Sequence, residues 1–133
     1  CSAYSVILTL PGLPTVYYGD EAGLEGYRDP FNRRPFPWGK EDNELLSWYR
    51  FLGQLRKNYS AFALGEFKEI FIDDNVFVFS RKDDESEVLI AINLSDKAFD
   101  LEYEGELFEL SCEKTHKEKC TMMAKTCGIF IKK

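Results

Sequence analysis

The second half of the chain repeats one pattern, in which short runs of β-branched, aromatic and other apolar residues alternate with short polar segments. Seven runs after Ala61 predict strands, at residues 67–72, 76–81, 88–94, 99–103, 107–112, 121–124 and 128–132. The polar segments 73–75 and 82–86 have the length of hairpin connections. Apolar and acidic side chains alternate from Leu101 to Glu104, as in a strand with one buried face. Residues 63–133 are therefore predicted to form an antiparallel β-sandwich domain.

Residues 5–20 have a different character, because they are apolar and are interrupted by Pro11 and Pro14. Two prolines preclude a continuous helix through this segment. Residues 15–18, Thr-Val-Tyr-Tyr, are β-branched or aromatic without alternation, which is typical of a strand buried on both faces of a parallel sheet. Because one strand forms no sheet, we expect it to belong to a larger sheet whose other strands lie outside this chain.

An amphipathic helix is predicted over residues 41–58. Its apolar residues recur every three or four positions and are Leu45, Trp48, Tyr49, Leu52 and Leu55. Asp42 or Asn43 is placed to cap the first turn, and Arg56 and Lys57 suit the carboxyl end. The preceding residues 21–39 show no periodicity but contain several glycines, prolines and aromatics, which predicts an ordered, functional loop.

Composition argues against several classes of protein. With 17 Lys and Arg against 23 Asp and Glu, the formal charge is −6 and no basic stripe exists to bind nucleic acid. The longest apolar stretch, residues 3–16, is interrupted by Pro and Gly, so we expect no membrane-spanning helix. Four unevenly spaced cysteines do not indicate a disulfide framework and, with no signal-peptide pattern, favour a cytoplasmic location. The 133 residues are too few for a complete (β/α)8 barrel, which needs about 250.

Residues 10–39, LPGLPTVYYGDEAGLEGYRDPFNRRPFPWG, carry a family resemblance. They resemble the segment of α-amylase-family glycoside hydrolases that runs from the eighth barrel strand into its following loop, and most of all that of neopullulanases, cyclomaltodextrinases, maltogenic amylases and amylopullulanases. Residues 88–95 and 127–133 are similar to strands of the family's carboxyl-terminal β-sandwich. The resemblance implies a mixed α and β chain, mainly β. Residues 1–62 would be the last strand, loop and helix of the catalytic barrel, and residues 63–133 the β-sandwich.

The resemblance also implies what the chain lacks. The family's catalytic Asp, Glu and Asp lie on earlier barrel strands, so this portion is expected to be inactive alone. A retaining hydrolase needs two carboxyl groups about 5 Å apart across the scissile bond. Asp20 and Glu21 are sequence neighbours that point apart, so we expect them to anchor the loop. The parent enzyme would cleave α-1,4, and as a second option α-1,6, bonds of maltodextrin, starch, pullulan or cyclodextrin, without a cofactor.

The family pattern assigns a binding role to two residues of the loop. An aspartate and an arginine four residues later contact glucose units in these enzymes, and the pattern falls on Asp29 and Arg33. A carboxylate and a planar guanidinium suit sugar hydroxyls. The alternative is an Asp29–Arg33 ion pair that only shapes the loop. For the aromatic residues Phe36 and Trp38, packing of the loop and helix against the barrel is favoured over stacking on sugar rings.

The single histidine lies among cysteines, in the order Cys112, His116, Cys120 and Cys127. The spacing does not follow a common zinc pattern, and lysines and glutamates interleave over residues 113–119 as in a solvated hairpin. The sequence therefore predicts no metal site.

Two functions from different classes remain open. As the end of a glucan hydrolase, the chain would have the upstream barrel as its partner and, alone, would expose apolar surface and self-associate. As a stand-alone, non-catalytic carbohydrate-binding or interaction module, it would bind maltodextrin saturably and expose no such surface.

Overall fold

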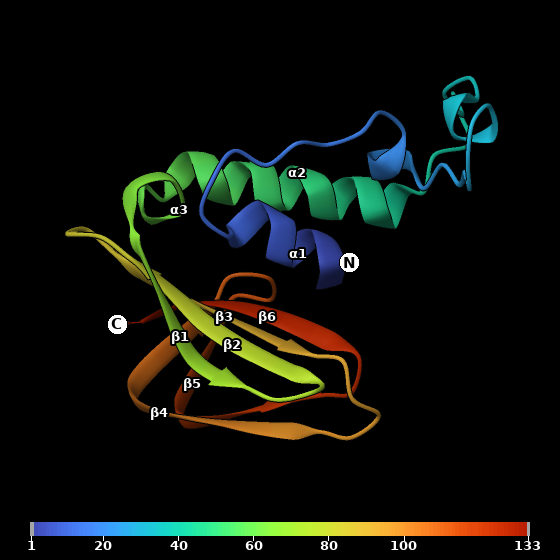
Figure 1. The fold of residues 1–133 in the computed structure, drawn as a ribbon. Helices are drawn as coiled ribbons and strands as arrows, with labels where there is room; N and C mark the ends of the chain where they lie inside the picture. Colours follow the sequence, from blue (N-terminus) through green and yellow to red (C-terminus); the bar gives the residue numbers. More distant parts are fainter. Residues whose placement is uncertain (1, 133) are drawn as a thin grey trace.

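The computed structural model describes residues 2–132. A layer of helices lies against one side of a curled antiparallel sheet (Figure 1). The helices are α1 (Ser2–Thr9), α2 (Asn43–Asn58) and the short α3 (Ala61–Leu64), with 3-10 turns at Asp20–Ala22 and Phe31–Arg33. The strands are β1 (Glu66–Ile72), β2 (Val76–Lys82), β3 (Glu87–Asn93), β4 (Phe99–Glu109), β5 (Lys114–Met122) and β6 (Thr126–Lys132).

The six strands form one sheet in the order β1-β2-β3-β6-β4-β5, and every pairing is antiparallel. The sheet curls strongly. Three strands lie between β1 and β4, and yet the ring of Phe71 on β1 stacks on Phe99 of β4 at a centroid distance of 5.3 Å. The predicted antiparallel β domain is confirmed. The two sheets of a sandwich are replaced by one sheet whose halves face each other.

Two hydrophobic clusters lie on opposite faces of the central strands. On β3, Val88, Ile90 and Ile92 pack with the helices, whereas Leu89 and Ala91 face β4 and β5. Helices α1 and α2 contribute Leu8, Tyr49, Leu52 and Leu55 to the first cluster, and β4 and β5 contribute Leu101, Leu107, Cys120 and Met122 to the second. Burial on both faces explains why β3 reads as a continuous apolar run.

Helix α2 confirms the predicted amphipathic helix. Asp42 is the residue that caps it, and its carboxylate accepts a hydrogen bond of 3.0 Å from the backbone N–H of Leu45. The helix begins at Asn43, slightly inside the predicted range, and Tyr49, Leu52 and Leu55 are its buried residues.

The predicted strand over residues 15–18 is wrong for this structure. The segment has no strand conformation, and Val16, Tyr17 and Tyr18 are 43–49% exposed. All six strands of the described chain pair among themselves, so residues 15–18 have no strand to pair with. The end of a barrel is therefore not visible in this fold.

Two further predictions in the sheet need correction. The runs 99–103 and 107–112 join into the single strand β4, whose register shifts between Glu102 and Glu106 beside Gly105 (φ 93°). Such a bulge needs the positive φ that glycine adopts without strain. Residues 113–119 belong to a solvated hairpin, as expected, but most of them lie in its strand β5, which runs from Lys114 to Met122 and so begins earlier than the predicted run 121–124. Pairing with β4 extends β5 through this charged stretch, and its charged side chains face solvent.

Two arginines connect the helices to one another and to the sheet. Arg56 of α2 donates to the carbonyl oxygens of Leu8 and Gly12, each at 2.9 Å. Arg81 of β2, 1% exposed, donates to Thr9 O and Gly65 O, again at 2.9 Å each. Burial lowers the pKa of Arg81, and the charge of Arg56 lowers it further. Both guanidinium groups thus satisfy carbonyls at or just beyond the end of α1, which the helix leaves without intrahelical partners.

Replacement of Arg81 by Met should destabilise the chain by about 2 kcal/mol, because the buried carbonyl of Thr9 and the partly buried carbonyl of Gly65 lose their donor. Urea unfolding monitored by circular dichroism measures the change. Arg50→Met, on the exposed side of α2, is the matched control and should stay within about 0.5 kcal/mol of the parent. Equal midpoints for Arg81→Met and the parent would contradict the proposed connection.

Replacement of Asp42 by Ala should cost about 1 kcal/mol, because the Leu45 N–H at the start of α2 loses its acceptor. Asp42→Asn retains a capping oxygen and should behave nearly as the parent. Thermal unfolding of the three proteins tests this, and equal losses for both variants would show that charge rather than capping matters.

Candidate functional site

The loop over residues 21–39 projects from the amino-terminal end of α2, away from the sheet (Figure 1). Its start is fixed by Glu21, whose carboxylate accepts from the N–H of Gly19 at 2.9 Å. The Tyr18 hydroxyl donates to the Arg34 carbonyl at 3.0 Å and links the segment before the loop to the second half of the loop. A side chain at Gly26 would lie 2.5 Å from the Asn32 Cα, so the two limbs of the loop approach closely. Glu21 therefore anchors the loop as predicted, whereas an anchoring role for the Asp20 side chain stays a prediction.

Asp29 and Arg33 form an ion pair across the turn Phe31–Arg33. Nε of Arg33 lies 3.1 Å from Oδ1 of Asp29, and Nη2 donates to Oδ2 at 3.5 Å. The side chains are 63% and 68% exposed, so solvent screens the pair and its contribution to stability is small. A guanidinium carries five N–H donors, so the pair leaves donors for a ligand. The geometry is compatible with an ion pair that only shapes the loop and with a pair that also contacts sugar. The contact with sugar stays a prediction.

The aromatic residues of the loop present large apolar faces. The rings of Phe36 and Trp38 are 4.5 Å apart, and Trp38 is 81% exposed. Tyr27 is 94% and Phe31 55% exposed. Within the described residues these rings do not join a core, so the expected packing of Phe36 and Trp38 against a barrel remains a prediction.

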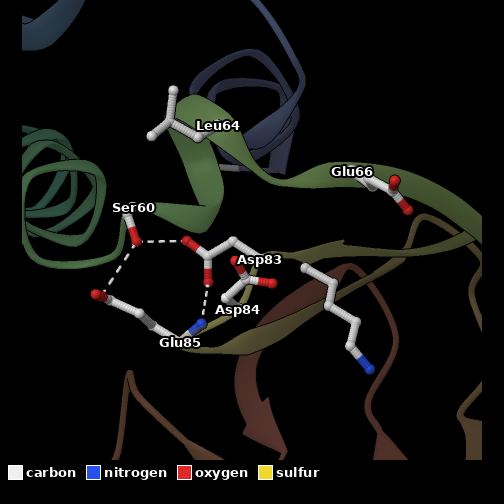
Figure 2. A pocket seen from close by; sticks show the side chains of 7 residues that line it. Ser60, Leu64, Glu66, Asp83, Asp84 and Glu85 are labelled. Atoms are coloured by element: carbon white, nitrogen blue, oxygen red, sulfur yellow. Dashed lines mark hydrogen bonds between the residues drawn. The ribbon is translucent and has the colours of Figure 1, made fainter.

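A hollow of about 560 Å³ lies between α3 and the β2–β3 hairpin (Figure 2). Its lining is mostly acidic, with Glu66, Asp83, Asp84 and Glu85 beside Ser60. The Ser60 hydroxyl donates to Asp83, and the other Asp83 oxygen accepts from the N–H groups of Glu85 and Ser86 at 3.0 and 2.8 Å. The Ser60 hydroxyl and these N–H groups hold the pKa of Asp83 below its usual value. Asp83 therefore closes the hairpin turn and ties it to the helices.

Three potential metal ligands gather between β4 and β5. Nε2 of His116 lies 3.0 Å from Oε2 of Glu109 and 3.8 Å from Sγ of Cys120, and the three donor atoms lie within 4.8 Å of one another. His116 and Glu109 are 13% and 18% exposed, and Cys120 is 3% exposed. The spacing of His116 and Cys120 is visible in the sequence, whereas Glu109 is not predicted to join them, because only strand pairing brings it close.

Burial and the neighbouring groups shift the pKa values of Glu109, Cys112 and Cys120. Burial acts to raise the pKa of Glu109, but contacts with Cys112, Ser111 and His116 outweigh it, and the net pKa is lowered. Burial and the Glu109 charge raise the pKa of Cys120 to about 11. Burial and the Glu109 contact also raise the pKa of the Cys112 thiol. Glu109 is thus the acceptor at the centre of a group of thiols and an imidazole.

The chain is similar to several larger enzymes. It is 39% identical over 72 residues to an amylopullulanase of Thermoanaerobacter thermohydrosulfuricus, covering 54% of this chain and 5% of that protein. It is 37% identical over 98 residues to a cyclomaltodextrinase of Geobacillus thermopakistaniensis, covering 71% of this chain and 17% of that one. The chain thus spans only a small part of these relatives. No family model matches the sequence.

Solved structures give the same result over nearly the whole chain. An Anoxybacillus α-amylase superposes with a TM-score of 0.89 and 27% identity, covering 96% of this chain and 30% of that one. The maltogenic amylase from S. marinus gives a TM-score of 0.85 with 32% identity, covering 98% and 19%. The resemblance to the α-amylase family is confirmed, and the chain corresponds to a carboxyl-terminal part of these glycoside hydrolases. None of the described helices has the length and apolar character needed to cross a membrane.

Proposed function

We propose that the chain is the carboxyl-terminal portion of a retaining α-glucan hydrolase that cleaves α-1,4 and, as a second option, α-1,6 glucosidic bonds. Residues 1–62 complete its (β/α)8 catalytic barrel, and residues 63–133 form the β domain that covers it. The observation that carries the proposal is the match of nearly the entire chain to a minor part of much larger amylases, at 27–32% identity. The substrate is a maltodextrin, starch, pullulan or cyclodextrin.

The distribution of exposed apolar side chains supports a missing barrel. Before residue 39 the large hydrophobic residues that are at least 43% exposed are Ile7, Leu13, Val16, Tyr17, Tyr18, Tyr27, Phe31 and Trp38. Such a collection on one segment marks an interface. In the longer protein, residues 15–18 would then find the neighbouring strands that they lack here. The stand-alone binding module is disfavoured, because it was expected to expose no such surface.

The chain's own residues would bind and position the substrate, while the catalytic carboxyl groups lie elsewhere in the longer protein. Asp29 accepts from sugar hydroxyls, and Arg33 donates to them from the loop. Their ion pair already brings the carboxylate and the guanidinium next to each other, so one sugar ring could contact both groups. No cofactor takes part in this proposal.

The chain by itself should release no reducing sugar from maltodextrin or pullulan above a heat-treated control. Sequencing of the coding DNA on the 5′ side should find an in-frame extension of roughly 250 codons that carries the family's Asp, Glu and Asp. A start codon immediately before Cys1, together with saturable maltodextrin binding, would instead favour the stand-alone module. Hydrolysis by the chain alone would contradict the catalytic assignment.

Arg33→Ala in the longer enzyme should lower kcat/KM on maltotriose roughly tenfold, because a charged hydrogen bond to the sugar is lost. Arg33→Lys should recover only part of it, since an ammonium lacks the planar fork. Arg50→Ala, exposed on α2, is the control for loss of a surface charge. Unchanged kinetics together with a lower melting temperature would contradict the sugar contact and would mean that the Asp29–Arg33 ion pair only shapes the loop.

A further inference from the structure

The β4–β5 hairpin brings together side chains that a regular strand would keep apart. His116 and Cys120 are both on β5, four residues apart, and in a straight strand their Cα atoms would be about 13 Å apart. Yet Nε2 of His116 lies 3.8 Å from Sγ of Cys120. Between them Glu118 adopts a φ of 60°, opposite the β4 bulge between Glu102 and Glu106. This bend in β5 makes the two side chains converge.

Glu109 completes the convergence from the end of β4. Its Oε2 lies 3.0 Å from the same Nε2 of His116. Zinc bonds of about 2.0 Å to nitrogen and oxygen and about 2.3 Å to sulfur place tetrahedral ligand atoms about 3.3–3.6 Å apart. The two observed separations, 3.0 and 3.8 Å, bracket this range. Small side-chain adjustments would therefore let one ion contact all three residues.

The kinds of atom select the metal. A thiol, an imidazole and a carboxylate together suit zinc better than calcium or magnesium, which prefer oxygen ligands alone. Cys112 is exposed in the turn between β4 and β5 and is not among the three residues whose donor atoms lie within 4.8 Å of one another. A rearrangement of this exposed turn would bring its sulfur to the ion as a second thiolate. Cys120 lies on the buried side of the cluster. The ring of His116 also packs edge to face against the ring of Phe130, with the ring centroids 5.9 Å apart.

We propose that Glu109, His116 and Cys120 bind one zinc ion between β4 and β5, and that Cys112 supplies the fourth ligand. Each thiol binds as the thiolate and releases its proton to solvent. The ion joins the end of β4, the turn and the edge strand β5 to the second hydrophobic cluster. Its role is structural, because four protein ligands leave no open position for a substrate. The proposal is independent of the glucan chemistry.

Titration of the metal-free, reduced chain with Co²⁺ tests the site. One Co²⁺ should bind per chain with thiolate-to-metal charge-transfer absorption, and zinc should displace it. Zinc should also raise the melting temperature, whereas Mg²⁺ should not, because the ion binds the folded state. Cys120→Ser and His116→Gln should each weaken binding at least tenfold, and Cys112→Ser should weaken it to a smaller degree.

Cys127→Ser is the matched control, since Cys127 contacts Ser5 of α1 instead and should leave Co²⁺ binding unchanged. Should Cys120→Ser fail to fold by circular dichroism, the more exposed His116 provides the same test. Absence of the charge-transfer band in the folded parent would overturn the site and leave a hydrogen-bonded Glu109–His116 pair. Unchanged binding by Cys112→Ser would overturn its assignment as the fourth ligand.

Discussion

Two guanidinium groups, the buried one of Arg81 and the partly buried one of Arg56, hold the end of α1 against the rest of the helical layer and the sheet. A helix as short as α1 ends with carbonyl oxygens that need donors, and burial removes water as a source of them. Arg56 and Arg81 reach these oxygens, and those just beyond, from α2 and β2. Arg81 also reaches Gly65, where α3 passes into β1. Because the donors of one guanidinium have fixed directions, one orientation of helices and sheet satisfies all of these oxygens.

The sheet meets a second constraint, which is the burial of both faces of its central strands. Strand β3 directs alternate side chains into the helical cluster and into the cluster formed with β4 and β5. A flat sheet of six strands could not supply the second contact. The sheet therefore curls until Phe71 of β1 meets Phe99 of β4. The bulge at Gly105 and the bend at Glu118 allow the outer hairpin to follow this curvature.

The loop and the hairpin cluster differ in how far the sequence could predict them. The family motif proposes Asp29 and Arg33 as a pair, and the structure adds their ion pair, because a spacing of four residues across a tight turn brings both side chains together. The cluster at His116 could not be predicted from spacing. Its neighbours Glu109 and Cys120 become neighbours through a strand pairing and a local bend, neither of which leaves a periodic signal in the sequence.

Local patterns in the sequence determined the helix that Asp42 caps, the strands that alternate or run apolar, and the resemblance to α-amylase-family enzymes. These features depend on residues that are close together in the sequence and on the period of the hydrophobic pattern, so they can be predicted from the sequence. Tertiary structure alone decided the curl of the sheet, the fusion of two predicted runs into β4 and the exposure of residues 15–18. Each of these features depends on which strands, distant in the sequence, are present to pair. A local sequence pattern does not specify the strand with which a segment pairs.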